Sequence, residues 1–392
     1  MSDVSAPQRG SARNTSLAAS VLELIASGQA TSRTELAELL GAAASTISLT
    51  VNQLVERGLV AEQGTRSSAG GRPRKVLRIG GADEFALAAD LGGRHARIGV
   101  VLPGGGLDAV STIPFAVDAG PEAALPPLAE ALEALAGARG RAALRGVGLS
   151  LPGPVDVEHG TVTLPSRMPG WNRFRVDAWL QERFGVPAAV GNDANCMALG
   201  EHTVQPAERR QSITVKIGSA IGAGIIADGR LYRGANGAAG DITHVRIDAA
   251  GDTPCSCGNI GCLETVASGA ALARILRERG AATRTVEDVV RLVSNDADPE
   301  ATRAVRQAGR YLGQVLAANV NFFNPDAVYL GGILSTLEPL VAAVRSQLYE
   351  ACHPLATEHL VIERTSLGAD AGLVGAGQLA LHRALTRALA DS

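Results

Sequence analysis

The sequence contains no stretch that approaches the roughly 18 consecutive apolar residues of a membrane-spanning helix, which excludes a helical integral membrane protein. It also lacks a recognisable secretory signal, so we expect a cytoplasmic protein, in which structural disulfides are rare. Lysine is scarce as well. Only Lys75 and Lys216 are lysines among 36 basic residues, and with abundant Gly and Ala we attribute this to coding bias.

The 392 residues are enough for two or three domains with a large buried core. The charge is unevenly distributed along them. Residues 1–80 carry nine Lys and Arg against six Asp and Glu, a net charge of +3, whereas the whole chain has a net charge of −3. The remainder is therefore acidic, and a basic N-terminal module on an acidic body is compatible with nucleic-acid binding.

Three of the five cysteines lie close together, at Cys255, Cys257 and Cys262, and His244 is the only histidine nearby. Three thiolates and one imidazole form a complete tetrahedral Cys₃His set for structural zinc. The alternative is a loop of buried or disulfide-bonded cysteines, which would need an oxidising compartment. The sequence therefore predicts one Zn²⁺ bound by these four residues.

Two carboxylates flank the predicted metal ligands, since Asp241 precedes His244 and Glu264 follows Cys262. A bound metal would fix both carboxylates beside an imidazole. Carboxylate oxygens accept hydrogen bonds from hydroxyl groups, so a fixed pair suits a hydroxyl-rich ligand such as a sugar.

The basic N-terminal module has the pattern of a helix-turn-helix. Leu17 to Ile25 have helical spacing, Ser32 and Glu35 form a capping box that opens a second helix ending at Gly41, and a third helix runs from about Ser45 to Gly58. Two short helices joined by a Gly-bearing turn and followed by a longer helix predict this motif. Residues 1–14 are polar and unpatterned, and we expect a disordered tail there.

The third helix places one set of short polar and apolar side chains outward, as a reader of the major groove requires. These residues are Ser45, Thr46, Leu49, Asn52 and Gln53. The alternative is an ordinary solvated helix of a three-helix bundle.

Two short strands, 58–62 and 76–79, then predict a wing, and the basic segment between them ends in Arg72, Arg74 and Lys75. Such a segment can enter a narrow minor groove, whereas the alternative is a flexible linker.

The pattern Gly-x-x-x-His followed by C-x-C-G-x-x-G-C-x-E, at residues 240–264, resembles the signature of the ROK family of repressors and sugar kinases. The resemblance implies a two-lobed, actin-like ATPase domain over residues 83–392, with a hinge near 195–212 and a C-terminal helix. It also implies that the His and three Cys bind zinc and that His244 and Glu264 contact sugar. The winged helix-turn-helix at 15–82 resembles the DNA-binding half of ROK repressors, which the kinases of the family lack.

In the body, Val190–Asn192 ends a strand, and Asp193 begins a helix. The resemblance implies that Asn192 binds sugar and that Asp193 corresponds to the catalytic base of the ROK kinases. An Asp at this position is also expected for helix stability alone. Periodicity predicts further helices over 269–278, 286–294 and 299–323 and a final helix from about 372.

Several positions depart from the pattern of the kinases. Arg94 replaces Thr in the first phosphate loop, and Ser219 and Ala220 replace Thr and Gly in a second Gly-rich turn predicted over 218–224. Asp241 replaces Glu, and Arg167 occupies a region where relatives that bind sugar often have Asn. A methyl group at Ala220 would crowd a phosphate.

These features favour a transcriptional regulator, most simply a repressor, that acts as a homodimer or tetramer on palindromic double-stranded DNA and senses a sugar or sugar phosphate. No catalytic activity is expected, because both phosphate loops are altered. The alternatives are an ATP-dependent sugar kinase and a regulator that binds no small ligand and responds to a protein partner.

Overall fold

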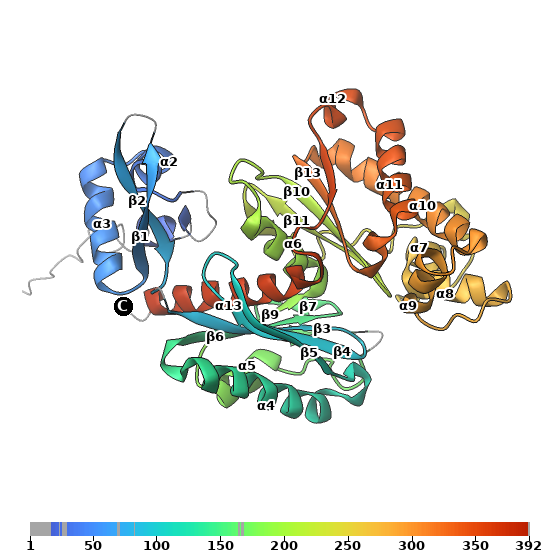
Figure 1. Cartoon of the computed structure of the whole chain (residues 1–392), viewed down its shortest axis with the longest axis horizontal. Helices are drawn as coiled ribbons and strands as arrows, with labels where there is room; N and C mark the ends of the chain where they lie inside the picture. The colour runs from blue at the N-terminus through green and yellow to red at the C-terminus, as the bar shows by residue number, and fades with distance from the viewer. Residues whose placement is uncertain are drawn as a thin grey trace, which may run out of the picture.

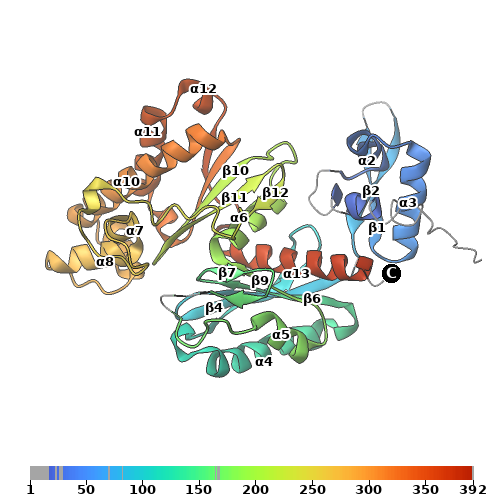
Figure 2. The same ribbon diagram turned by 180° about the vertical axis from the view of Figure 1, so that it is seen from behind.

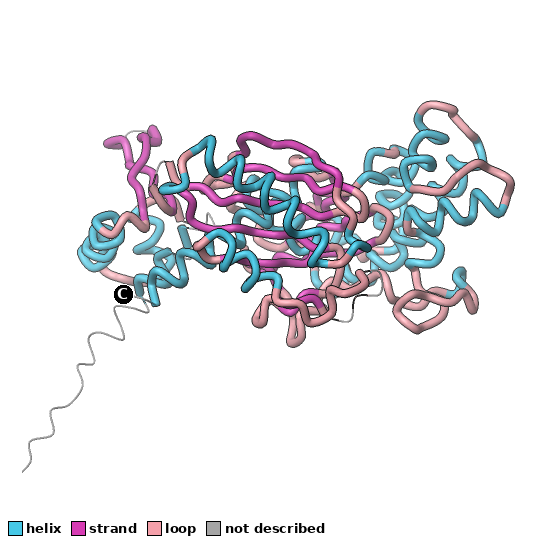
Figure 3. The backbone as a smooth tube through the Cα atoms, turned by 90° about the horizontal axis from the view of Figure 1, so that it is seen from below, coloured by secondary structure: helices cyan, strands magenta, loops and turns pink. Residues whose placement is uncertain are grey.

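The computed structural model describes residues 17–22, 24–25, 30–68, 71–81, 83–163, 165 and 168–390. The predicted disordered tail and Arg167 lie outside the described residues. Three bodies follow one another along the long axis of the molecule, an N-terminal module and two lobes (Figures 1 and 3). Within the described residues, no helix has the length and apolar character needed to cross a membrane.

The N-terminal module consists of helical residues 17–22 and 24–25, helices α2 (Arg33–Leu40) and α3 (Ala44–Glu56), and an antiparallel hairpin of β1 (Val60–Ser68) and β2 (Gly71–Ile79). Ser32 caps α2 by accepting a hydrogen bond from the Glu35 amide, and Gly41 ends it in the left-handed conformation, as predicted. The Glu35 carboxylate of the predicted capping box accepts instead from the amide of Thr31, one residue earlier. The core contains Val21, Ile47 and Val51. The module therefore has the element order of a winged helix-turn-helix.

The wing differs from the sequence prediction, because its strands are longer. The segment predicted to be a loop, 64–75, belongs mostly to the two strands, which pair from Val60 opposite Ile79 to Ser68 opposite Gly71. Pairing satisfies backbone groups that a loop would leave to water. Arg72, Arg74 and Lys75 therefore lie on β2.

The first lobe is a five-stranded sheet in the order β5-β4-β3-β6-β9. The strands are β3 (Phe85–Leu91), β4 (His95–Val101), β5 (Leu107–Pro114), β6 (Leu144–Leu151) and β9 (Ala188–Asn192). Helices α4 (Pro121–Arg139) and α5 (Val176–Phe184) cover one face, and α13 (Ala371–Ala390) covers the other (Figures 1 and 2). A small hairpin, β7 (Val155–Asp156) and β8 (Thr161–Val162), follows β6.

The second lobe is a five-stranded sheet in the order β12-β11-β10-β13-β14. The strands are β10 (Ser212–Ile217), β11 (Ile221–Ala227), β12 (Arg230–Tyr232), β13 (Ala327–Gly331) and β14 (Val361–Arg364). Its helices are α7 (Glu264–Ala267), α8 (Gly269–Glu278), α9 (Val286–Ser294), α10 (Pro299–Phe323), α11 (Glu338–Ala351) and α12 (Pro354–Thr357). The predicted bounds of α8, α9 and α10 are confirmed.

Helix α6 (Asp193–Val204) packs on the sheet of the second lobe and α13 packs on the sheet of the first, so these two helices join the lobes. Glycines bring their backbones together. A Cβ atom at Gly200 would lie 1.9 Å from the Ala371 oxygen, and one at Gly375 would lie 1.8 Å from the Cys196 oxygen. The two helices therefore touch through backbone atoms, with no intervening side chains.

Candidate functional site

The four predicted metal ligands lie together, with their ligand atoms all within 4.8 Å of one another. The Sγ atoms of Cys257 and Cys262 are 3.8 Å apart, and Cys255 Sγ is 3.5 Å from His244 Nδ1. Metal bonds of about 2.3 Å to sulfur and 2.0–2.1 Å to nitrogen around a tetrahedral ion imply separations of roughly 3.75 and 3.5 Å. The cluster therefore has the dimensions of a tetrahedral site. Because the described cysteines are all free, the disulfide alternative does not hold.

Glu264 begins α7 directly after this cluster, and its side chain is buried. Its Oε2 accepts hydrogen bonds from the Thr243 hydroxyl at 2.8 Å and from the Ile221 amide at 3.1 Å. Thr243 precedes His244, and Ile221 begins β11. Glu264 therefore ties the cluster to the end of the turn between β10 and β11. Asp241, by contrast, is exposed.

Asn192 and Asp193 lie where β9 ends and α6 begins. The Asn192 side chain caps the helix by accepting from the amides of Ala194 and Asn195, and its amide nitrogen is 3.2 Å from Asp193 Oδ1. Asp193 Oδ1 also accepts from the Ala194 amide at 2.8 Å. The helix terminus thus fixes the Asp193 carboxylate and leaves Oδ2 for other partners.

Lys216 forms an ion pair with that second oxygen, although sequence reasoning attributed this lysine to composition alone. Its Nζ lies 2.5 Å from Asp193 Oδ2, and the two side chains are 22% and 17% exposed. Lys216 is on β10, so this ion pair links the second lobe to the first residue of α6. The signal in the sequence was the rarity of lysine, with one of the two placed just before the Gly-rich turn.

Asp90, near the end of β3, is a second carboxylate that interacts electrostatically with Lys216. It also accepts a hydrogen bond from the Ser150 hydroxyl. Burial raises the pKa of Asp90, although the Lys216 ammonium and the Ser150 hydroxyl partly offset the effect. Burial alone would lower the pKa of Lys216, but Asp193 and Asp90 outweigh it, and that pKa is raised. Lys216 is therefore charged at neutral pH.

The predicted Gly-rich turn over 218–224 is wrong in extent. Only residues 218–220 form the turn, and Gly222 and Gly224 lie within β11. The physical reason is the packing of α6, since a Cβ at Gly224 would lie 2.6 Å from the Ala194 oxygen. These two glycines therefore make room for a helix. Ser219 and Ala220 are exposed in the turn, and Arg94 is exposed in the turn between β3 and β4.

The predicted DNA contacts on α3, residues Ser45, Thr46, Leu49, Asn52 and Gln53, are all exposed. Arg33, missed by sequence reasoning, holds this helix in place. Its guanidinium donates to the Ser48 carbonyl, to Asn52 Oδ1 at 2.8 Å and to Glu62 Oε1 at 2.7 Å. One arginine of α2 thus joins α3 to the wing and orients the Asn52 amide.

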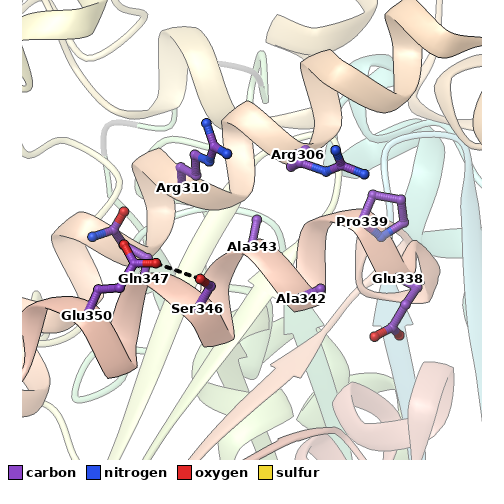
Figure 4. Close-up of a pocket in the computed structure, with 9 residues that line it drawn as sticks. All are labelled: Arg306, Arg310, Glu338, Pro339, Ala342, Ala343, Ser346, Gln347 and Glu350. Carbon is purple, nitrogen blue, oxygen red and sulfur yellow. Dashed lines mark hydrogen bonds between the residues drawn. The ribbon is translucent and has the colours of Figure 1, made fainter.

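A groove of about 470 Å³ lies elsewhere, between α10 and α11 (Figure 4). Arg306 and Arg310 line it from α10, and Ser346 and Glu350, which are hydrogen-bonded at 2.8 Å, lie on α11. No residue of the predicted ligand site lines this groove. It lies on the far side of the second lobe from α6 and β9 (Figure 1).

The model of the ROK family matches residues 86–383. The chain is 31% identical over 345 residues to the DNA-binding transcriptional dual regulator NagC of Escherichia coli, covering 84% of this chain and 83% of NagC. A crystal structure of a ROK transcriptional regulator, a homologue of the E. coli MLC protein, matches 97% of this chain and all of its own, with 26% identity and a TM-score of 0.76. The ROK hexokinase of Thermus thermophilus is 33% identical and matches 76% of this chain and 97% of its own, with a TM-score of 0.64.

Proposed function

Because the chain belongs to the ROK family, we propose that it is a transcriptional repressor that binds operator DNA through residues 15–82 and senses a sugar or sugar phosphate through residues 83–392. The observation that carries this proposal is the N-terminal module. The regulator of known structure matches 97% of the chain, whereas the hexokinase, at nearly full length, matches only 76%. The hexokinase thus has the length of the two lobes alone, whereas the regulator also has a counterpart of the N-terminal module.

The kinase alternative rests on Asn192 and Asp193, which match the family pattern, and on the similarity to the hexokinase. Against it stands the ion pair of Asp193 with Lys216, which puts a positive charge where a general base must accept a proton. Phosphoryl transfer depends on positioning and charge at the phosphate loops, and Arg94, Ser219 and Ala220 change both loops. We therefore expect no turnover of ATP.

One experiment separates the three functions. An operator gel shift and a coupled ATPase assay are run on the same panel of sugars and sugar phosphates. Release of DNA without ATP consumption supports the sensor, and sugar-dependent ATP consumption would identify a kinase. Specific operator binding that no member of the panel changes would favour the regulator that responds to a protein partner.

In this proposal, the exposed face of α3 reads the major groove, and the basic residues of β2 contact the minor groove and phosphates. Arg33 engages Asn52 Oδ1, which leaves the Asn52 amide nitrogen to donate to a base. Arg33 is therefore a positioning residue for the recognition helix.

Mutations in the wing and mutations in α3 should change DNA binding in different ways. Arg72→Ala and Arg74→Ala should weaken binding to all sequences and reduce its salt dependence, because phosphate contacts release counterions. Gln53→Ala should cost roughly 1–3 kcal/mol on the preferred site only and relax one base position. Binding isotherms at several salt concentrations, with exposed Arg277→Ala as a control, measure both effects. Equal effects on specific and nonspecific DNA from both kinds of variant would contradict this division.

We further assign Zn²⁺ to the Cys₃His cluster, which holds the segment from Asp241 to Glu264 in place. Because His244 Nδ1 faces Cys255, metal at Nδ1 leaves Nε2–H as a donor for a sugar hydroxyl. Glu264 connects this ordered segment to β11 through its hydrogen bonds to Thr243 and Ile221. The zinc is structural in this assignment, and its role is to position ligand-binding groups.

A homodimer or tetramer is expected, since one recognition helix reads too few base pairs for specificity and two modules suit a palindrome. Phe322 is 92% exposed and Leu355 is 73% exposed on the outer face of the second lobe. They lie on either side of Asn321, whose side chain is hydrogen-bonded to the backbones of Ala351 and His353. Phe322→Glu should therefore weaken association, whereas Tyr232→Glu, at an exposed position on β12, should not. Light scattering at micromolar concentration measures both, and a monomeric wild type would contradict the prediction.

A further inference from the structure

The turn between β4 and β5, residues 102–106, lies between α6 and the N-terminal module (Figures 1 and 2). Its centre consists of Gly104 and Gly105, whose φ angles are +84° and +87°. A residue with a side chain is strained at such angles, whereas glycine adopts them freely. Because two adjacent residues of the turn carry no side chain, neighbouring elements meet its backbone directly.

Gly105 is buried against the C-terminal end of α6. A Cβ atom there would lie 3.0 Å from Thr203 Cγ2, 3.4 Å from Val204 Cγ1 and 3.5 Å from Val374 Cγ1 at the start of α13. The Thr203 hydroxyl donates to the Leu199 carbonyl within α6 at 2.8 Å. That hydrogen bond holds the Thr203 side chain with its methyl group toward the turn.

Gly104, the preceding residue, faces the wing. A Cβ atom at Gly104 would lie 3.0 Å from Nη1 of Arg78. Arg78 is exposed on β2, where it pairs with Ala61 of β1. Two neighbouring residues of one turn thus contact the end of α6 and a side chain of the DNA-binding module.

The turn is anchored at its base. The Leu102 carbonyl accepts a hydrogen bond from Gln378 Nε2 of α13 at 3.1 Å. Val101, the last residue of β4, packs in an apolar cluster with Cys196 of α6 and Leu373 of α13. A turn held in this way keeps its shape when a neighbouring element moves against it.

The module is also held by the C-terminal end of α13. Leu385 lies in the core of the module, and Arg57 donates to the Ala388 carbonyl at 3.3 Å. Both contacts involve the end of a single helix, so by themselves they leave the module free to rotate about that end. The contact of Arg78 with the turn lies on a different element and fixes the remaining angle.

Resting on the proposed repressor function and its expected dimer, we propose that this turn couples the end of α6 to the angle of the DNA-binding module. The turn belongs to the first lobe, whereas α6 packs on the sheet of the second. When the lobes rearrange, Thr203 moves against Gly105, and the turn passes the movement to Arg78. The angle of each module sets the separation of the two recognition helices, and therefore the spacing of half-sites that the dimer accepts. Thr203 and Arg78 are positioning residues in this assignment.

The test uses the full-length, metal-loaded protein and a DNA duplex that the wild type selects from random sequences. In further versions of this duplex, the half-sites are moved apart in steps of one base pair, up to about one helical turn. Thr203→Ser deletes the methyl group that meets the turn and keeps the hydroxyl, whereas Thr203→Val keeps a methyl group there and loses the hydroxyl. Arg78→Ala removes the contact at Gly104 without straining the turn.

The wild type should prefer one spacing. Thr203→Ser and Arg78→Ala should each reduce that preference by about fivefold or more, the lower end of the usual coupling between two sites, and Thr203→Val should stay within about twofold of the wild type. Because both changes act through one turn, the double variant should lose about as much as the more affected single variant. Binding to nonspecific DNA should be the same in every variant, and thermal unfolding shows that each variant is folded.

An unchanged spacing preference in folded Thr203→Ser and Arg78→Ala would overturn the inference, as would fully additive effects of the two changes. If Arg78→Ala weakened binding to specific and nonspecific DNA by the same factor, Arg78 would be a phosphate contact, and the inference would fail. A wild type that binds all spacings equally would also overturn it while leaving operator recognition intact. A wild type that binds no duplex specifically would instead refute the repressor function itself.

Discussion

Replacing Cys257 with serine should remove the metal from the protein and abolish its response to any effector. Cys257 supplies one of three thiolates in a cluster whose ligand atoms lie within 4.8 Å of one another, and serine is a poor zinc ligand at neutral pH. Binding of structural zinc is coupled to folding, so loss of the metal should loosen the segment that carries Asp241 and His244. Elemental analysis should find about one zinc per wild-type chain and a small fraction of that in the variant.

The effect should stay local at first, because the hydrophobic core of the second lobe is large and lies mainly outside the cluster. Operator binding should therefore survive in Cys257→Ser at temperatures where induction is already lost. Cys352→Ser is the matched control, since Cys352 is a buried thiol outside the cluster that contacts the Ala317 carbonyl. A wild type without metal, or a variant that retains both metal and induction, would contradict the assignment.

The second large effect is expected at the contact between the C-terminal helix and the DNA-binding module. Leu385 of α13 is 7% exposed and belongs to the core of the module, and Arg57 donates to the Ala388 carbonyl at 3.3 Å. Leu385→Ala should destabilise this junction by about 2–5 kcal/mol, the usual cost of truncating a buried leucine. The module would then no longer follow the movement of the lobes.

Induction should consequently disappear, while each module still recognises its half-site. An effector acts only through a difference in affinity between two arrangements, and a loose junction removes that difference at the DNA. Operator gel shifts with and without effector, alongside calorimetric titration of the effector, make the measurement. Normal effector binding with unchanged DNA release in Leu385→Ala would show that the signal travels by another route. Leu389→Ala, at a partly buried position on the same helix, should have a smaller effect.

The sequence predicts the parts of the fold that depend on local patterns. The bounds of α8, α9 and α10 follow from apolar periodicity with their caps, and the metal cluster follows from the spacing of three cysteines and one histidine. These features involve residues close in the chain, so their geometry is set by a few turns.

Features that depend on contacts between distant elements were missed or only partly predicted. The pairing of Lys216 with Asp193 requires the start of α6 to lie over the sheet beside Gly222 of β11, and nothing in either segment alone indicates that packing. For the same reason, Gly222 and Gly224 were interpreted as a phosphate-binding turn when they accommodate a helix. The role of Arg33 could likewise not be predicted from the sequence, because its three hydrogen-bond partners lie on α3 and on β1.

The backbone contact between α6 and α13 has a consequence for how such a regulator can acquire new specificity. With Gly200 and Gly375 each against a carbonyl of the other helix, the two backbones pack directly on each other and leave no room for a side chain between them. We therefore expect the pair to move as one stiff lever, in which Asp193 lies beside the middle of α13 and Leu385 lies nearer its C-terminal end. Side chains around the effector can be exchanged without altering the lever, so the choice of small molecule and the choice of operator are free to change independently.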